Sequence, residues 1–300
     1  MIKVKNVRKV FEDMEALKNV SLHIEKGSIY GLLGSNGAGK TTLLKILAGI
    51  YKEDSGEILI DNQPIFENIA LKQKMIFLPD TLYFYPQYTI SQMADFYRSM
   101  FPSFSEERFQ KLSEIFTIDQ NKKIHRLSKG MQRQVAFWLA LSTMPEILIL
   151  DEPIDGLDAV MRQNIKNLLF QDVAERAMTV LISSHNLREV EDICDHVGIL
   201  HQGEIIIEKD LDDLKADVHK IQVAFKGGVL PDSFLQNFQV LYKETRGSVL
   251  LCIVRGKKED ITAKVQSFHP VIFDLLPLTL EEIFVYEMGD VGYEIENIIV

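Results

Sequence analysis

Residues 34–41 read Gly34-Ser35-Asn36-Gly37-Ala38-Gly39-Lys40-Thr41, and Thr42 follows them. This octapeptide matches every fixed position of the G-x-x-x-x-G-K-[ST] phosphate-binding loop. Its glycines allow consecutive backbone N–H groups to surround phosphate oxygens, and a helix that starts at Lys40 would point its positive end at the same charge. Lys40 is expected to bind the β- and γ-phosphates, and the Thr41 hydroxyl to ligate Mg²⁺. The segment therefore predicts a nucleotide-binding protein that uses Mg²⁺.

The residues around this loop indicate an α/β fold. A short apolar run at 28–33 precedes the loop, and residues 40–48 carry leucine and isoleucine at helical spacing. Apolar runs at 147–150 and 180–183, with a helical stretch between them, predict a parallel sheet covered on both faces. Residues 1–30 alternate apolar and polar positions, which predicts two or three further strands.

The run Ile147-Leu148-Ile149-Leu150 ends in Asp151 and Glu152. Ligands of parallel α/β sheets bind beyond the carboxyl ends of the strands. Asp151 is therefore expected to hold Mg²⁺, directly or through water, and Glu152 to accept a proton from the attacking water. Without the phosphate loop, the same two acids would equally be solvated side chains at a strand end.

Composition restricts the partners of this chain. Its 300 residues carry 43 acidic and 33 basic side chains, a net charge of −10, so we expect no nucleic-acid partner. Cys194 and Cys252 are expected to be ordinary reduced thiols. The first residues have no signal-peptide layout, and no apolar run approaches the ~18 residues of a membrane-spanning helix. We therefore expect a soluble chain that acts across a membrane only with a second polypeptide.

With both motifs in view, residues 1–210 resemble the ABC ATPases. Three further segments, in the family's order, carry the resemblance: Leu127-Ser128-Lys129-Gly130-Met131 is similar to the LSGGQ signature, Gly156-Leu157-Asp158 to the D-loop, and Ile182-Ser183-Ser184-His185 to the switch-histidine segment. The resemblance implies that the chain binds and hydrolyses ATP with Mg²⁺. It also implies an α/β P-loop fold of ABC ATPase type, with a parallel-sheet core, N-terminal antiparallel strands and a helical subdomain at about 83–145.

The same resemblance assigns roles to individual residues. Ser128 and Gly130 would contact the ATP held by a second subunit, and Asp158 would lie at that interface. His185 would contact the γ-phosphate beside the catalytic Glu152, and Phe11 would stack on adenine. Taken alone, each has a simpler alternative: the histidine as a polar residue at a strand end, Gly-Leu-Asp as a common turn, and the phenylalanine as a core residue.

Two positions depart from the family pattern. Asp80 stands where the family usually has a glutamine that touches Mg²⁺, and we expect it to be a metal-proximal residue that couples to the membrane partner; a solvent-facing loop acid is the alternative. Lys129 and Met131 replace a glycine and a glutamine of the signature, which affects catalytic efficiency rather than nucleotide binding. By analogy with the family, the aromatic segment 82–86 follows the motif that faces the transmembrane partner, and aromatic residues are favoured as interface anchors. A packed loop within the helical subdomain is the alternative.

The domain prediction is residues 1–214 for the nucleotide-binding domain and residues 215–300 for a C-terminal α+β extension. Within the extension, strands at 221–225, 240–244, 248–254 and 271–276 and helices at 231–238 and 258–268 give the order β-α-β-β-α-β, the split βαβ (ferredoxin-like) pattern. A final helix, 279–287, is expected to follow.

The resulting prediction is an ATP-binding subunit that powers a separate transmembrane permease. It would be peripheral on the cytoplasmic face of the membrane and would pair with a second nucleotide-binding subunit, either a copy or a homologue. The compact extension and the closing segment Leu278–Phe284 resemble bacterial exporters of drugs, lipids or antimicrobial peptides. The alternative is a soluble ABC-type ATPase that is not coupled to transport.

Overall fold

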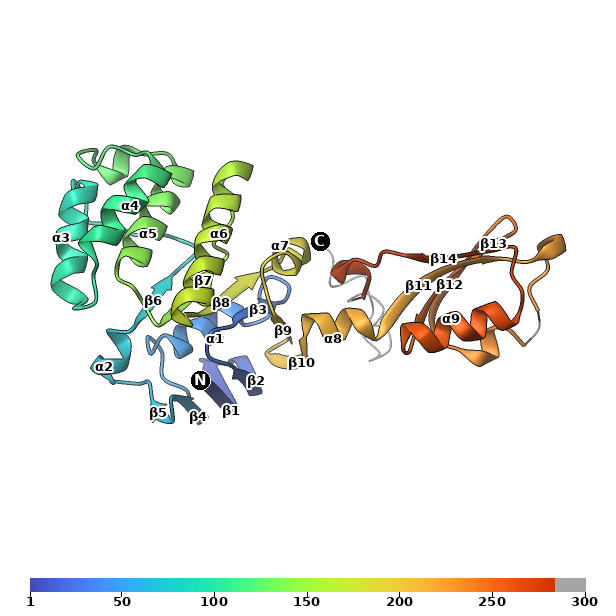
Figure 1. Ribbon diagram of the computed structural model, residues 1–300. Helices are drawn as coiled ribbons and strands as arrows, with labels where there is room; N and C mark the ends of the chain where they lie inside the picture. Colours follow the sequence, from blue (N-terminus) through green and yellow to red (C-terminus); the bar gives the residue numbers. More distant parts are fainter. Residues whose placement is uncertain (232, 284–300) are drawn as a thin grey trace. The chain divides into compact units, whose positions relative to one another are not determined.

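The computed structural model describes residues 1–231 and 233–283 and divides the chain into two compact units (Figure 1). The first is Met1–Glu208 and the second is Lys209–Val300. This boundary falls earlier than the predicted one after residue 214, because helix α8 (Leu211–Ala216) belongs to the second unit.

A six-stranded sheet in the order β10-β9-β3-β8-β7-β6 forms the centre of the first unit. Its strands are β3 (Ile29–Leu33), β6 (Met75–Leu78), β7 (Ile147–Asp151), β8 (Thr179–Ser184), β9 (His196–His201) and β10 (Glu204–Asp210). The pairs β3–β8, β3–β9, β6–β7 and β7–β8 are parallel. Every residue of β3, β7 and β8 is buried, which explains why these strands read as continuous apolar runs.

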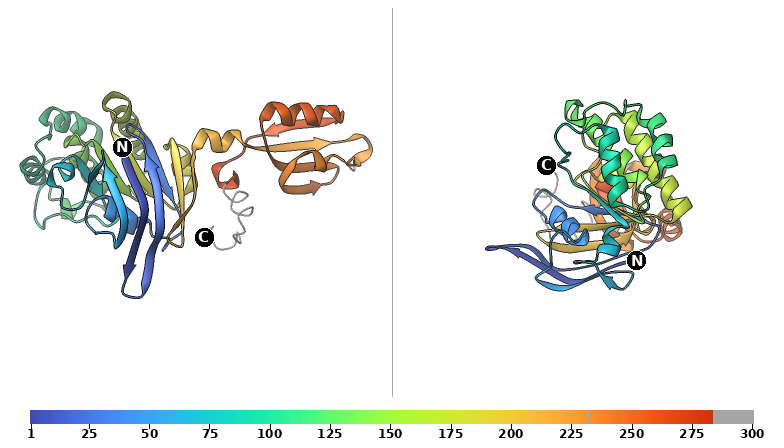
Figure 2. Two further views of the ribbon diagram at one scale, coloured as in Figure 1. Left: turned by 90° about the horizontal axis from the view of Figure 1, so that it is seen from below. Right: turned by 90° about the vertical axis from the view of Figure 1, so that its left-hand side faces the viewer.

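A second sheet in the order β2-β1-β4-β5 is antiparallel. It consists of β1 (Ile2–Phe11), β2 (Met14–Ile24), β4 (Ser55–Ile60) and β5 (Gln63–Pro64), and Figure 2 shows β1 and β2 as a long blue ribbon. Buried and exposed residues alternate along much of β1 and β2, because only one face of this sheet packs on the core.

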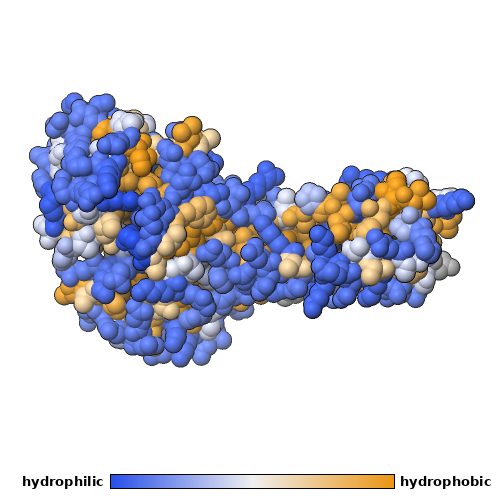
Figure 3. All heavy atoms as spheres, viewed as in Figure 1, coloured by the Kyte–Doolittle hydropathy of each residue, from blue (hydrophilic) through white to orange (hydrophobic). Residues whose placement is uncertain are grey.

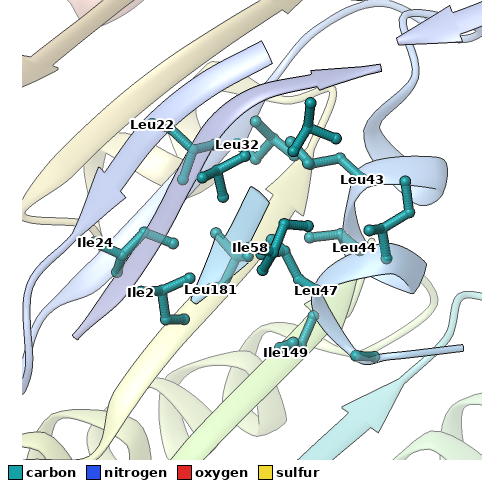
Figure 4. Close-up of a cluster of buried hydrophobic side chains, with 14 of the residues drawn as sticks. Ile2, Leu22, Ile24, Leu32, Leu43, Leu44, Leu47, Ile58, Ile149 and Leu181 are labelled. Carbon is teal, nitrogen blue, oxygen red and sulfur yellow. The ribbon is translucent and has the colours of Figure 1, made fainter. Parts of the chain in front are cut away.

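Helix α1 (Lys40–Leu47) fills the space between the two sheets. Figure 4 shows Leu44 and Leu47 of α1 among side chains of both, such as Ile58 of β4 and Ile149 of β7. All four side chains are fully buried. The helix that follows the phosphate loop is therefore fixed by apolar packing on two sides, which holds the loop in place.

The remaining helices of the first unit begin with polar caps. They are α2 (Ile69–Lys72), α3 (Ile90–Met100), α4 (Glu106–Phe116), α5 (Lys129–Ser142), α6 (Ala159–Arg176) and α7 (Leu187–Glu191). Thr89 and Gln92 form a capping box at α3, and Ser105 caps α4. Helices α3 to α5 form the green helical cluster of Figure 1, within the range predicted for the helical subdomain.

Trp138 of α5 is the largest fully buried side chain of this cluster. Its indole N–H donates to the carbonyl oxygen of Phe109, at 2.8 Å, and its ring stacks on that of Phe109 with 4.8 Å between centroids. We expect Trp138→Ala to lower the free energy of unfolding by about 3–5 kcal/mol, measured by urea denaturation. Phe170→Ala, at a position 39% exposed on α6, should cost about 0.5 kcal/mol or less. Equal effects of the two substitutions would contradict this packing account.

The second unit holds a four-stranded sheet in the order β12-β13-β11-β14. The elements are β11 (Val218–Ala224), β12 (Gln239–Arg246), β13 (Val249–Arg255), α9 (Lys258–Ser267) and β14 (Ile272–Leu276), and all three strand pairs are antiparallel. This is the strand order of the split βαβ pattern. Figure 3 shows apolar side chains on the surface of this unit.

The helix predicted at 231–238 is wrong: between β11 and β12, residue 232 aside, the structure describes the 3₁₀ turns Lys226–Gly228 and Leu235–Asn237 and no α-helix. Phe234, fully buried, inserts its ring among Phe225, Phe238 and Phe268, with centroids 5.1–5.3 Å apart. The ring of Phe234 is held by three other aromatic rings, and this packing, rather than helix propensity, sets the backbone of the segment.

The last predicted helix, 279–287, is described only in part. Residues 280–283 are helical after a capping box of Thr279 with Glu282, and the rest of the predicted helix lies outside the described residues. Across residues 1–231 and 233–283, the structure contains no helix with the length and apolar character needed to span a bilayer. Cys194 and Cys252 are both free and buried, as expected for reduced thiols, and burial raises the pKa of Cys252 to about 11.

Candidate functional site

The phosphate loop connects β3 to α1, and its backbone requires glycine at the helix start. Gly39 has φ of 108°, in the left-handed region. A Cβ at this position would lie 2.6 Å from the carbonyl oxygen of Ala16 and 3.0 Å from the side chain of Leu17, which is fully buried. No side chain caps α1. The first N–H groups of this helix therefore remain available to an anion.

Lys40 lies almost fully buried at the base of the loop, with 6% of its side chain exposed. Its Nζ donates to the carbonyl oxygen of Gly34 at 2.7 Å and lies 3.4 Å from Oε1 of Glu152. The ammonium group is thus held between the loop and the end of β7. A buried cation with one carboxylate partner at this distance is suited to receive phosphate oxygens.

The residues predicted to hold Mg²⁺ meet at the end of β7. The Thr41 hydroxyl donates to Oδ2 of Asp151 at 2.8 Å, and the Ser183 hydroxyl donates to Oδ1 at 2.6 Å. Asp151 is 2% exposed. Hydroxyl and carboxylate oxygens are the hard ligands that Mg²⁺ prefers, so this donor set fits the ion. When bound beside Thr41 and Asp151, Mg²⁺ would neutralise charge on the phosphates.

Glu152 follows directly and has φ of 48°, unusual for a non-glycine residue. Its N–H is directed at Ser183, 3.1 Å from Oγ and 3.3 Å from the carbonyl oxygen. Its Oε2 lies 2.9 Å from Nδ1 of His185. The strained backbone is therefore fixed from β8, and the carboxylate lies between Lys40 and the histidine. This arrangement suits a general base.

Two further carboxylates lie near Glu152 and His185. A carboxylate oxygen of Asp155 lies within 4.8 Å of a carboxylate oxygen of Glu152 and a ring nitrogen of His185. Glu189 of α7 accepts a hydrogen bond from the Ser184 hydroxyl at 3.2 Å. Burial raises the pKa of Glu189, the charges of Asp155 and Glu152 add to this effect, and the Ser184 hydroxyl opposes it. Three carboxylates, those of Glu152, Asp155 and Glu189, therefore influence one another in this part of the site.

An open cleft of about 510 Å³ lies over the phosphate loop. Its lining includes these predicted site residues: Ser35, Asn36, Gly37, Gly39, Lys40, Thr41, Thr42, Asp80 and Glu152. It also includes residues that the sequence did not indicate: Met14, Glu15, Ala16, Lys18, Gln202 and Gly203. Lys18 and Gly203 are joined by a backbone hydrogen bond of 2.7 Å, so the start of β2 and the β9–β10 turn form one wall.

Phe11 is not among the residues that line this cleft. Its ring packs edge-to-face on Tyr51, with 5.4 Å between centroids. Met14, 63% exposed, is its cross-strand partner and does line the cleft. The adenine contact of Phe11 stays a prediction. The dipeptide Gln202-Gly203, which forms a turn with positive φ at both residues, is the sequence signal that could have marked this wall of the cleft.

Asp80 lines the cleft after β6, but its carboxylate is paired elsewhere. Oδ1 lies 3.2 Å from a guanidinium nitrogen of Arg133, and 58% of the Asp80 side chain is exposed. Within residues 1–231 and 233–283, neither Thr41 nor Asp151 forms a hydrogen bond or an ion pair with this carboxylate. The predicted metal contact of Asp80 therefore stays a prediction, while the salt bridge to α5 is an observation.

The signature and the D-loop lie against each other. Ser128 caps α5 by accepting a hydrogen bond from the N–H of Met131, and Asp158 caps α6 in the same way. A Cβ on Gly130 would lie 2.6 Å from the carbonyl oxygen of Gly156, so the two segments pack backbone to backbone. Ser128 and Asp158 are both exposed. The structure thus brings the two segments together on one surface, outside the P-loop cleft.

This fold and cleft define a P-loop ATPase with an acidic strand end facing its phosphate loop. Comparison with known proteins identifies the family: the ABC transporter family model matches residues 17–155. The ATP-binding protein YtrB of Bacillus subtilis is 36% identical over 289 residues, which cover 96% of this chain and 98% of YtrB. The chain belongs to the ABC transporter family, as an ATP-binding subunit.

A further relative and a solved structure each match about 70% of this chain, which is close to the length of the first unit. The bacitracin transport ATP-binding protein BcrA of Bacillus licheniformis is 32% identical, covering 72% of this chain and 71% of BcrA. A dimeric ATP-binding cassette, solved in a post-hydrolysis state with ADP and phosphate, is 27% identical, covers 70% of this chain and 99% of that one, and superposes with a TM-score of 0.63. The chain is accordingly an ATPase that binds ATP with Mg²⁺.

Proposed function

We propose that this chain powers a separate transmembrane permease through a dimer that holds two ATP molecules between its subunits. The unit up to Glu208 is the nucleotide-binding domain. Lys40 and the loop amides bind the phosphates, and Glu152 accepts the proton of the attacking water while His185 contacts the γ-phosphate. Ser128, Gly130 and Asp158 complete the site of the other subunit.

The observation that supports this proposal is a site divided between two surfaces. Among the described residues, the lining of the P-loop cleft contains neither the signature nor the D-loop, although both carry exposed polar caps that suit phosphate recognition. A second subunit that presents Ser128 to the open cleft would supply what one copy lacks.

The aromatic segment after Asp80 suits contact with a membrane partner. Tyr83 is 78% exposed and Tyr85 is 43% exposed, and their rings lie 6.5 Å apart. Exposed aromatic side chains are suited to anchor a partner protein. Because these two follow Asp80, which lines the P-loop cleft, the partner would sense whether ATP is bound. The similarity to BcrA favours export of a peptide-like compound, with the permease on the membrane and this chain on its cytoplasmic face.

A photo-crosslinking experiment separates this function from the soluble alternative. A photoreactive residue at position 83 should capture a polytopic membrane protein from cells, with a yield that changes between ATP and ADP. The same residue at Val160, which is 71% exposed on α6, should capture little of it. If position 83 captures no membrane protein and the chain leaves the membrane fraction, the chain is a soluble ABC-type ATPase.

A further inference from the structure

Arg133 of α5 holds together three parts of the catalytic region. Its side chain is 13% exposed, and its guanidinium group donates to three acceptors on two other segments. One nitrogen donates to the main-chain oxygen of Glu152, and the other donates to the main-chain oxygen of Asp80, at 2.8 Å, and to its Oδ1, at 3.2 Å. The planar guanidinium presents fixed, forked donors, which suits such a bridge.

The acceptors stand at corresponding places of two neighbouring strands. β6 and β7 pair in parallel, so the residues that follow them leave the same edge of the sheet. Asp80 follows β6 and Glu152 follows β7, whereas Arg133 comes from the helical cluster. One side chain of α5 therefore fixes the spacing of two strand ends that both line the P-loop cleft.

Arg133 itself does not line that cleft. It lines a neighbouring cavity of about 370 Å³, together with Lys129, Asp155 and Gly156, and Asp80 lines both cavities. The Asp80–Arg133 pair is thus part of the wall between them. This placement argues that Arg133 acts through Glu152 and Asp80 rather than by touching ATP.

The effect on Glu152 follows from how its backbone is held. With φ of 48°, Glu152 depends on its surroundings to keep an unfavourable conformation, and Ser183 fixes its N–H while Arg133 fixes its carbonyl group. A catalytic group displaced by 1 Å can lose about 100-fold in rate.

We infer that Arg133 is a positioning residue for ATP hydrolysis, which aims the Glu152 carboxylate according to the position of the Asp80 loop. The inference rests on the proposed role of Glu152. It gives Asp80 a function that needs no metal contact. A movement of the loop after β6 reaches the catalytic carboxylate through one guanidinium group.

Steady-state ATPase kinetics of the full chain test the inference. Arg133→Gln should lower kcat by about 10- to 100-fold and change KM for ATP by less than about threefold, because Lys40 and the loop are intact. Arg133→Lys should recover part of kcat, since an ammonium group reaches one carbonyl oxygen but cannot hold both. The matched control is Arg98→Gln, which removes ion pairs with Asp95 and Glu106 on the cluster surface and should leave kcat unchanged.

A double-mutant cycle with Asp80→Asn measures how strongly the two substitutions are coupled in kcat. A purely structural role of Arg133 would give no such coupling. The combined loss of kcat in Arg133→Gln with Asp80→Asn should be smaller than the product of the separate losses, because both act on one bridge. If Arg133→Gln does not fold, Arg133→Lys replaces it in the cycle. A kcat within threefold of wild type in the folded Arg133 variant overturns the inference, as does a fully multiplicative cycle.

The same assay distinguishes failure of the inference from failure of the proposed catalytic role. If Glu152→Gln abolishes turnover while Arg133→Gln does not reduce it, only the positioning role is lost. If Glu152→Gln itself retains turnover, the proposed role of Glu152 fails and the inference falls with it.

Discussion

Lys40→Met is expected to weaken ATP binding by about 100-fold. Methionine retains the apolar stem, which is buried, and removes only the ammonium group that lies between Gly34 and Glu152. The loss of charge-assisted hydrogen bonds to phosphate, about 3 kcal/mol, corresponds to two powers of ten in Kd. Isothermal titration with ATP and Mg²⁺ measures the change.

The control for this substitution is Lys45→Met, in the last turn of the same helix. Lys45 lies over the ring of Tyr51, 5.5 Å from its centroid, and does not line the cleft. Its removal should leave Kd for ATP within about twofold of wild type, because the cation–π contact with Tyr51 does not involve ATP. An unchanged Kd in folded Lys40→Met would mean that phosphate is not bound at this loop.

Glu152→Gln is expected to lower kcat by about 100-fold or more while ATP still binds. Glutamine keeps the shape of the side chain and its contact with His185, but it cannot accept a proton from water. The loss of one charge beside Lys40 also removes a competitor for the ammonium group, so Kd for ATP should stay equal or fall. Phosphate release under steady-state conditions measures kcat.

Glu146→Gln is the matched control, because Glu146 precedes β7 and lies at the opposite end of the same strand. It pairs with Lys74 at 3.0 Å, with 43% of its side chain exposed, and should leave kcat unchanged. Turnover that survives Glu152→Gln would show that another group accepts the proton, and Asp155 would be the first candidate.

The sequence predicted those parts of the site whose chemistry is local. Residues 34–39 form a loop between β3 and α1 because glycine conformation and the amides of a helix start depend on neighbours in the chain. Asp151 and Glu152 meet Thr41 and Lys40 because parallel strands end at one edge of the sheet. To predict these contacts, it was enough to know the order of strands and helices along the chain.

Other contacts depend on distant packing and could not be predicted. Nothing near Arg133 in the sequence indicates that its side chain reaches both Asp80 and Glu152. Likewise, Gln202 forms a cleft wall only because β9 pairs with β3. In the second unit, the buried ring of Phe234 overrode a helical pattern, since a single side chain's packing outweighs weak helix propensity.

The mass of the Glu152→Gln variant in solution tests most directly whether each ATP is shared between two subunits. With saturating ATP and Mg²⁺, light scattering should give twice the mass of one chain. With ADP in place of ATP, it should give the mass of a single chain. Adding Ser128→Asp, which keeps the cap of α5 but places a carboxylate against phosphate, should abolish the dimer. A chain that stays single with ATP, or a dimer indifferent to both nucleotide and Ser128→Asp, would contradict the account.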